Sequence, residues 1–222
     1  QVMQAEGVKT AIEALRRNKP WSMGSLYWQL NDVWPVTSWS GLDYYGNWKA
    51  LHYTVKKAYS PVLISPVIEN GRLRVYAVSD LPEDVTGTLK ISSFQFNGPE
   101  WFQDEKEINV PANEKKRVAE IPLSAILQDI SDTLNTVIHT SFKNSKTGQL
   151  TSNNLYFTSV KDLNLPDPDV SAIFEPGDEG IYVTLNTDML AKSVYLESNI
   201  HKGHFSDNFF DLLPGQNKEI LF

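Results

Sequence analysis

Residues 20–53 read PWSMGSLYWQLNDVWPVTSWSGLDYYGNWKALHY, and the interpretation of the chain works outward from them. This stretch holds five of the six tryptophans of the 222-residue chain: Trp21, Trp28, Trp34, Trp39 and Trp48. Indole is large, carries an N–H that needs a partner, and is awkward to bury completely. The cluster is therefore either an aromatic mini-core beneath a loop or a carbohydrate site. In a sugar site the flat indole faces would cover the C–H face of a pyranose, while interleaved Asn, Gln, Asp and Ser bond its hydroxyls.

The residues before and within this stretch carry both helix and strand patterns. Val8, Ile12 and Leu15 follow the i, i+4, i+7 spacing of an amphipathic helix. Residues 26–30 belong to a nearly continuous apolar run, which predicts a strand buried on both faces, as in a parallel sheet. After a polar and aromatic loop, the apolar spacing predicts a second helix over residues 48–59.

Helix, buried strand, long loop and helix form the repeating unit of an α/β barrel. In such barrels the chemistry lies on the loops that follow the carboxyl ends of the strands, and the tryptophan-rich loop occupies that position. Sixty residues cannot close a barrel of about 250 residues. We therefore expect residues 1–60 to be the C-terminal end of a (β/α)8 catalytic TIM barrel, whose remainder lies N-terminal in the same polypeptide.

From residue 61 the pattern becomes that of β-structure without helices. Short alternating segments are separated by turn signals such as Asn70-Gly71. About seven strands in about 100 residues are typical of an immunoglobulin-like β-sandwich, predicted here for residues 61–163. The chain has no cysteine, so packing alone must hold the two sheets together. The expected strands lie at 63–68, 73–79, 86–96, 105–110, 116–121, 135–142 and 154–160.

A stiff linker, LPDPD at residues 165–169, precedes the last part of the chain. Further strands are expected at 170–174, 180–185, 193–197 and 219–222. Residues 164–222 are thus predicted to form a second, small immunoglobulin-like β domain, near the lower size limit for independent folding. The predicted fold class is mainly β: immunoglobulin-like β-sandwich domains preceded by the last α/β piece of a barrel.

Charge and composition exclude several kinds of partner. Residues 1–60 hold seven Lys and Arg against four Asp and Glu, whereas residues 61–222 hold thirteen against twenty-three. Such an acidic C-terminal part argues against nucleic acid, which requires clustered cations. No apolar run reaches the roughly 18 to 20 residues of a membrane span.

The sequence also offers little metal or thiol chemistry. Without cysteine, thiolate catalysis and cysteine–zinc sites are excluded. His201 and His204 form an i, i+3 pair, but no third ligand is placed to complete a metal site, and a surface hairpin is the simpler interpretation. We expect no metal and no cofactor.

The stretch SLYWQLNDVWPVTSWSGLDYYGNWKALHYTVKKAYSPVLISP, residues 25–66, resembles the end of the catalytic barrel in β-mannosidases of glycoside hydrolase family 2. Three tryptophans fall within twelve positions of it, and LPGQNKEILF at residues 213–222 resembles the last domain of the same enzymes. The family is described as a barrel followed by immunoglobulin-like domains. The resemblance therefore covers essentially the whole chain.

The resemblance implies a retaining exo-hydrolase that removes a terminal β-linked mannose from the non-reducing end of a glycan. Such an enzyme uses a glutamic acid as acid/base and a second glutamate as nucleophile, about 5 to 5.5 Å apart. In the family these glutamates follow the fourth and seventh barrel strands. The glutamates before the sandwich here, Glu6 and Glu13, lie on the first helix instead. No catalytic residue is therefore expected in this chain.

The resemblance assigns substrate-binding roles to Trp28, Asn31, Asp32 and Trp34. Trp28 would be the platform beneath the terminal sugar, or alternatively interior packing of the barrel. Asn31 and Asp32 would bond hydroxyls or brace neighbouring loops, and the further alternative for Asp32 is to cap the loop. Trp34, together with Trp39, would form the pocket rim or wedge the loop against the first sandwich domain.

Other functions remain open at this point. A β-galactosidase or an exo-β-glucosaminidase of the same family is the nearest alternative, because the loops that select the sugar are absent. A stand-alone carbohydrate-binding or structural β module is another. The expected partners are a β-mannoside or related oligosaccharide, the missing N-terminal barrel, and, through the apolar surface that a severed barrel exposes, a second copy of the chain.

Overall fold

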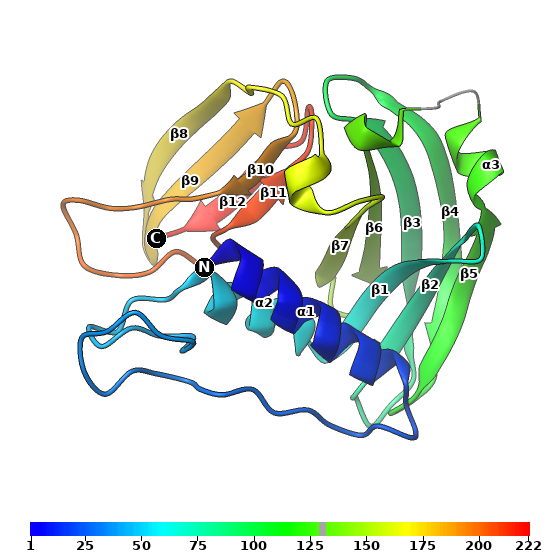
Figure 1. Cartoon of the computed structure of the whole chain (residues 1–222), viewed down its shortest axis with the longest axis horizontal. Helices are drawn as coiled ribbons and strands as arrows, with labels where there is room; N and C mark the ends of the chain where they lie inside the picture. The colour runs from blue at the N-terminus through cyan, green and yellow to red at the C-terminus, as the bar shows by residue number, and fades with distance from the viewer. Residues whose placement is uncertain (129–131) are drawn as a thin grey trace. The chain divides into compact units, whose positions relative to one another are not determined.

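The computed structural model describes residues 1–128 and 132–222 (Figure 1). Clustering of contacts divides the chain into two compact units. One unit comprises residues 1–12, 26–58 and 165–222, and the other comprises residues 13–25 and 59–164. The domain boundaries at 60 and 164 stay a prediction.

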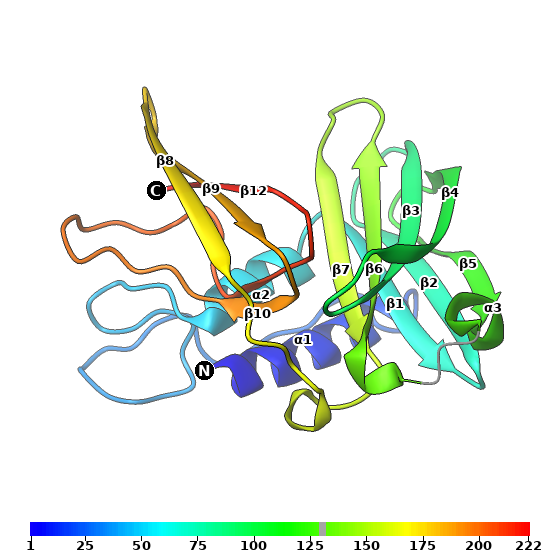
Figure 2. The ribbon, with the colours of Figure 1, turned by 90° about the horizontal axis from the view of Figure 1, so that it is seen from above.

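The second of these units is a β-sandwich of two antiparallel sheets, which Figure 2 shows as separate layers. One sheet has the order β1-β2-β5 and the other the order β4-β3-β6-β7. The immunoglobulin-like prediction is confirmed. The strands are β1 (Val62–Glu69), β2 (Arg72–Ser79), β3 (Val85–Gln95), β4 (Glu100–Val110), β5 (Lys115–Pro122), β6 (Thr136–Asn144) and β7 (Leu150–Tyr156).

The core of the sandwich follows directly from alternation along the strands. Leu73, Val75 and Ala77 recur at every second position of β2 and are completely buried. They pack with residues of the opposite sheet such as Ile91 and Phe142. The β1–β2 hairpin turns at Asn70-Gly71, where positive φ values of 52° and 71° match the turn that a two-residue hairpin favours.

The expectation of a helix-free sandwich was wrong in detail. A short helix, α3 (Leu123–Leu127), follows β5, and two 3-10 turns, η1 (Thr133–Asn135) and η2 (Val160–Asp162), lie beside β6 and beyond β7. Burial of Ile126 fixes α3, and the Trp101 indole Nε1 donates a hydrogen bond to the Ile126 carbonyl at 2.9 Å. Strand β7 also begins and ends four residues earlier than predicted.

The C-terminal part of the first unit is also β-structure, but smaller. It contains a sheet of order β12-β9-β8 and a β10–β11 pair. Strand β11 was not predicted, since three residues are too few to show an alternation, and β10 begins two residues earlier than expected. The strands are β8 (Val170–Gly177), β9 (Gly180–Thr187), β10 (Ala191–Val194), β11 (Phe210–Leu212) and β12 (Lys218–Leu221).

The two helices expected in residues 1–60 are present as α1 (Val2–Arg17) and α2 (Ala50–Ala58). Ile12 of α1 packs against Leu51 and Val55 of α2. Within the described ranges, no helix combines the length and hydropathy needed to cross a bilayer.

The strand predicted at residues 26–30 is not formed. This segment alternates as a strand does, with Tyr27 and Gln29 half-buried and Leu26, Trp28 and Leu30 exposed. A parallel strand requires neighbours to accept and donate its backbone hydrogen bonds. Among the described residues no strand lies alongside it, so the segment stays extended without a sheet.

Candidate functional site

The tryptophan-rich segment folds back on itself through backbone hydrogen bonds. The Gly41 and Leu42 N–H groups donate to the carbonyls of Gln29 and Leu30 at 3.0 and 2.8 Å, and the Asp32 N–H donates to Leu42 at 3.1 Å. A Cβ on Gly41 would lie 3.3 Å from the Leu30 carbonyl oxygen, so the two halves approach closely at this glycine. The loop that follows the extended segment at residues 26–30 is thereby fixed at its base.

A buried carboxylate holds the interior of this loop. Asp32 is 5% exposed and accepts hydrogen bonds from the Ser38 hydroxyl and, at 2.8 Å, from the Ser40 hydroxyl. Lys49 forms an ion pair with it, with Nζ 2.9 Å from Oδ2. The hydrogen bond from Ser38, followed by those from Lys49 and Ser40, lowers the pKa of Asp32 to about 2. Asp32 is thus ionised at any ordinary pH.

A second carboxylate shapes the tip of the loop. The Asp43 side chain accepts from the N–H groups of Tyr45 and Asn47, each at 2.8 Å. The Gly46 N–H donates to the Asp43 carbonyl, and Gly46 has a φ of +84°, which favours glycine. Asp43 is therefore committed to the turn and does not project from it.

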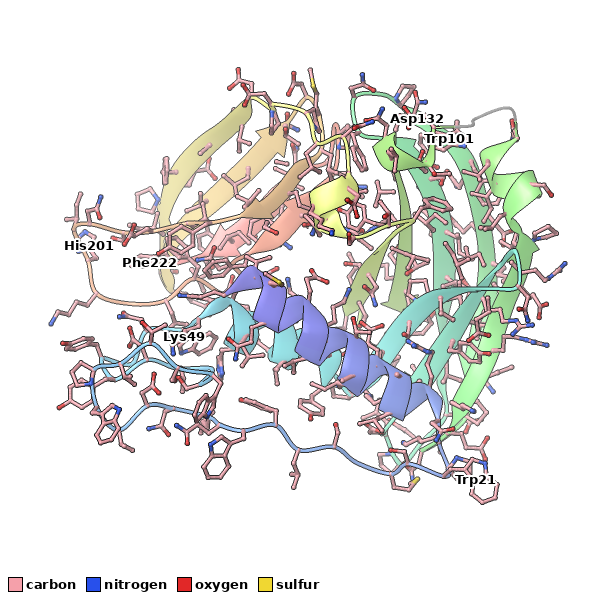
Figure 3. The ribbon with its side chains drawn as sticks, viewed as in Figure 1. Trp21, Lys49, Trp101, Asp132, His201 and Phe222 are labelled. Carbon is pink, nitrogen blue, oxygen red and sulfur yellow. The ribbon has the colours of Figure 1, made fainter. Side chains whose placement is uncertain are left out.

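The tryptophans of the cluster lie mostly in contact with solvent, as Figure 3 shows for Trp21. Exposed fractions are 87% for Trp21, 75% for Trp28, 65% for Trp34 and 59% for Trp39. Only Trp48 of the five has aromatic partners among the described residues, with its ring packed against His52, Tyr53 and His204. The aromatic mini-core interpretation is therefore wrong for four of the five indoles.

Of the four residues predicted to bind substrate, three are exposed and Asp32 is buried. Trp28 and Trp34 present exposed rings, and a cis peptide bond joins Trp28 to Gln29. Asn31 is exposed, with its Nδ2 donating to the Asp32 carbonyl at 3.1 Å. Asp32 points into the loop, so its contacts are those of the bracing role. Substrate contact by these residues stays a prediction.

Sequence reasoning missed the groups that hold Asp32. Ser38, Ser40 and Lys49 lie 6, 8 and 17 residues after it, and no periodicity links such spacings. The available signal was compositional, because Lys49 is the one basic residue between Pro20 and Val55 and an isolated charge in an aromatic segment needs a partner.

Neither carboxylate of the segment is available for acid/base chemistry. Its two carboxylates, Asp32 and Asp43, are both occupied within the loop. The described part of the chain contains no group of three His, Asp or Glu side chains able to hold a metal ion, His201 and His204 included. What the segment offers is a set of exposed rings and the exposed Asn31 amide on a fixed backbone.

Comparisons with known proteins agree along the whole chain. Residues 71–162 match the family model of the Mannosidase Ig/CBM-like domain, and residues 165–222 match that of an Ig-fold domain. The whole chain aligns at 30% identity with Beta-mannosidase A of Neosartorya fischeri and at 32% with Beta-mannosidase of Capra hircus. It aligns at 29% identity, with a TM-score of 0.88, with the crystal structure of the Beta-D-Mannosidase from Dictyoglomus thermophilum. Over its whole length the chain is homologous to β-mannosidases.

Members of the β-mannosidase family are glycosidases, and this chain matches only a part of them. It spans about a quarter of their length: 26% of the Neosartorya and Capra proteins and 27% of the Dictyoglomus chain. The exo-chitosanase of Amycolatopsis orientalis shares the fold, with a TM-score of 0.74 at 21% identity over 98% of this chain and 30% of its own.

Proposed function

We propose that this chain is the C-terminal part of a retaining exo-β-mannosidase. It supplies aromatic residues to the sugar pocket together with accessory sandwich domains, and the catalytic carboxylates come from the preceding part of the same polypeptide. The observation that carries the proposal is the 75% exposure of Trp28 on a segment whose backbone is fixed. The kinship with β-mannosidases supports the choice of sugar.

Trp28 is suited to lie beneath the terminal sugar. Its ring stands at the end of an extended segment, immediately before the loop that Asp32 and Lys49 lock. An indole face attracts positive charge, and the sugar ring gains positive charge as the glycosidic bond breaks. Stacking on Trp28 therefore strengthens toward the transition state, which is the condition for a rate effect.

Asn31 and Trp34 complete the proposed pocket, and Asp32 positions them. The exposed Asn31 amide can donate to and accept from sugar hydroxyls, while Trp34 offers a second apolar surface at the rim. Asp32 anchors the loop through Lys49, which keeps Asn31 in place without touching the sugar.

The exposed row of Leu26, Trp28 and Leu30 identifies the other partner. The row alternates with half-buried residues, as one face of a barrel strand does. In the whole protein the rest of the barrel covers Leu26 and the backbone of residues 26–28, while the Trp28 ring faces the sugar. In the chain alone, a second copy would cover this face, and size-exclusion chromatography should then show a dimer or larger species.

The test is hydrolysis of an aryl β-mannoside by the whole protein. Replacing Trp28 by Ala should lower kcat/KM by about 100-fold, which corresponds to about 2.7 kcal/mol of transition-state stabilisation. Trp21→Ala is the matched control, because Trp21 is another exposed indole but lies outside the proposed pocket. Equal losses in both variants would contradict the role of Trp28. The 222-residue chain alone should give no turnover above buffer.

Exo-β-glucosaminidase is the second candidate, because the exo-chitosanase shares the fold over nearly the whole chain. The same assay with aryl β-glucosaminide and β-galactoside in place of mannoside discriminates these sugars. A free-standing binding module would instead bind mannosides as the isolated chain, with tryptophan fluorescence quenched in the wild type but not in Trp28→Ala.

A further inference from the structure

A long connection between two short strands belongs to the same compact unit as the tryptophan-rich loop. Residues 195–209 join β10 to β11, and fifteen residues without a regular element are more than a turn requires. Connections of that length are commonly functional. Figures 1 and 2 both show this connection, in orange, beside the light-blue segment that precedes α2.

The base of the connection is firmly anchored. Asp207 forms ion pairs with Lys57 of α2 at 2.7 Å and with Lys218 of β12 at 2.9 Å. The Lys56 ammonium donates to the Ser206 carbonyl at 3.2 Å. At the neck, the Asn208 side chain accepts from the Leu196 N–H and donates to its carbonyl, at 2.9 and 2.8 Å. The two ends of the connection are thereby held together against α2.

A stacked pair joins the connection to the tryptophan-rich loop itself. The His204 and Trp48 rings lie 4.0 Å apart between centroids with an interplanar angle of 16°. Isolated β-bridges also join Trp48 to Leu42 and Leu42 to Asn31. The His204–Trp48 stack is thereby linked to the backbone that holds the proposed pocket. The connection is therefore fixed relative to Asn31.

The tip of the connection, by contrast, projects freely. Ile200 is 86% exposed, and His201 and Lys202 are exposed as well. The Ser198 hydroxyl accepts from the His201 N–H at 3.1 Å and shapes the tip. Within the described residues neither the His201 nor the Lys202 side chain has a hydrogen-bond or ion-pair partner. Figure 3 shows His201 at the outer end of the connection.

We propose that residues 198–204 form a wall on the leaving-group side of the sugar site, and that His201 and Lys202 bond hydroxyls of the second sugar. This inference rests on the proposed function. The His204–Trp48 stack holds the connection beside the segment that carries the proposed pocket, and the tip itself is exposed, so it is placed to contact a part of the substrate that extends from the pocket. In an exo-acting enzyme the protruding part of the substrate is the leaving group, since the terminal sugar is the enclosed one.

The chemistry of the tip fits hydroxyl groups. The Lys202 ammonium supplies three donors, and the His201 imidazole supplies two ring nitrogens that can hydrogen-bond hydroxyls. Neither side chain makes a hydrogen bond or ion pair within the described residues, so both can turn toward a bound glycan. The tip thus acts on the specificity for long substrates, while Trp28 and Asn31 act on the terminal sugar.

The test uses the whole protein with His201→Ala and Lys202→Ala combined. For β-1,4-mannobiose and mannotriose we expect kcat/KM to fall about tenfold. For a small aryl β-mannoside, which has no second sugar, kcat/KM should stay within about twofold. Lys161→Ala, an exposed lysine in η2, is the control for the loss of a surface charge and should change neither substrate.

Each other outcome overturns the inference in a recognisable way. Unchanged kinetics for mannobiose and mannotriose mean that the tip does not touch the glycan. A parallel loss for all substrates means that the tip supports the fold rather than the second sugar. Failure of the unaltered protein to hydrolyse any β-mannoside overturns the proposed function, and the inference falls with it.

Discussion

The sandwich core and the tryptophan-rich loop are both well ordered by internal bonds, yet they treat apolar side chains in opposite ways. In the sandwich, Leu73, Val75 and Ile91 are fully covered by other parts of the chain. In the loop, Trp28 and Trp34 remain largely exposed although hydrogen bonds and the Asp32–Lys49 ion pair fix the backbone. A fixed backbone with uncovered rings indicates a surface that receives something. Order and burial are therefore separate properties here.

The largest expected effect lies in the core. Phe142→Ala removes a ring that is 1% exposed and packs so closely that a Cβ on Gly87 would lie 2.7 Å from it. The cavity left behind should lower the free energy of unfolding of the sandwich by about 3–5 kcal/mol. Urea unfolding followed by circular dichroism measures this, and a loss below about 1 kcal/mol would show that the core collapses around the gap.

The next effect is local to the loop. Asp32→Ala leaves Lys49 without its ion-pair partner and removes the carboxylate that accepts from the Ser38 and Ser40 hydroxyls. We expect the Leu42 amide, which reports the base of the loop, to exchange with deuterium at least about tenfold faster. Amides of β3 should be unaffected. Equal acceleration in both regions would mean that the loop and the sandwich do not open separately.

A smaller effect should appear on acidification. The pKa of Asp32 in the folded loop is about 2, below the value of about 3.9 for an unfolded aspartate. A group with a lowered folded pKa stabilises the loop above its unfolded pKa and loses that contribution as the pH falls. The loop should therefore hold above pH about 4 and weaken between about 4 and 2. Tryptophan fluorescence against pH measures this, and Asp32→Asn should remove the transition.

The smallest expected effect is at an exposed ring. Trp34→Ala removes a side chain that is 65% exposed, so the free energy of unfolding should change by less than about 0.5 kcal/mol. Its effect on mannoside hydrolysis by the whole protein should be larger than its effect on stability. A loss of stability comparable to that of Phe142→Ala would erase the distinction between the two regions.

The sandwich was predictable from sequence because its signal is local. Alternation along β2 and the Asn70-Gly71 turn each depend on neighbouring residues, and the two helices of residues 1–60 depend on one repeating period. Strand β11, by contrast, is only three residues long, and its position depends on Asn208 bonding to Leu196. Such a contact leaves no periodic trace in the sequence.

In the candidate site, too, local features could be predicted from the sequence, whereas contacts between distant residues could not. The tryptophan composition left an aromatic mini-core and a carbohydrate site open, and the exposure of Trp28 and Trp34 argues against the mini-core. The Asp32–Lys49 pair joins residues 17 positions apart and was not foreseen. The strand at residues 26–30 failed because strand formation depends on neighbours, and an apolar run alone does not supply them.

The carboxylate of Asp207 has a further consequence. It is shared by Lys57 on helix α2 and Lys218 on β12, so one of its two cations is synthesised long after the other. In a polypeptide that stops before residue 218, Asp207 would keep its ion pair with Lys57 of α2 but lose the ion pair with Lys218 of β12. We expect chains that stop before residue 218 to be degraded faster in pulse-chase labelling than chains that include β12, because the contact from α2 to that strand is then missing.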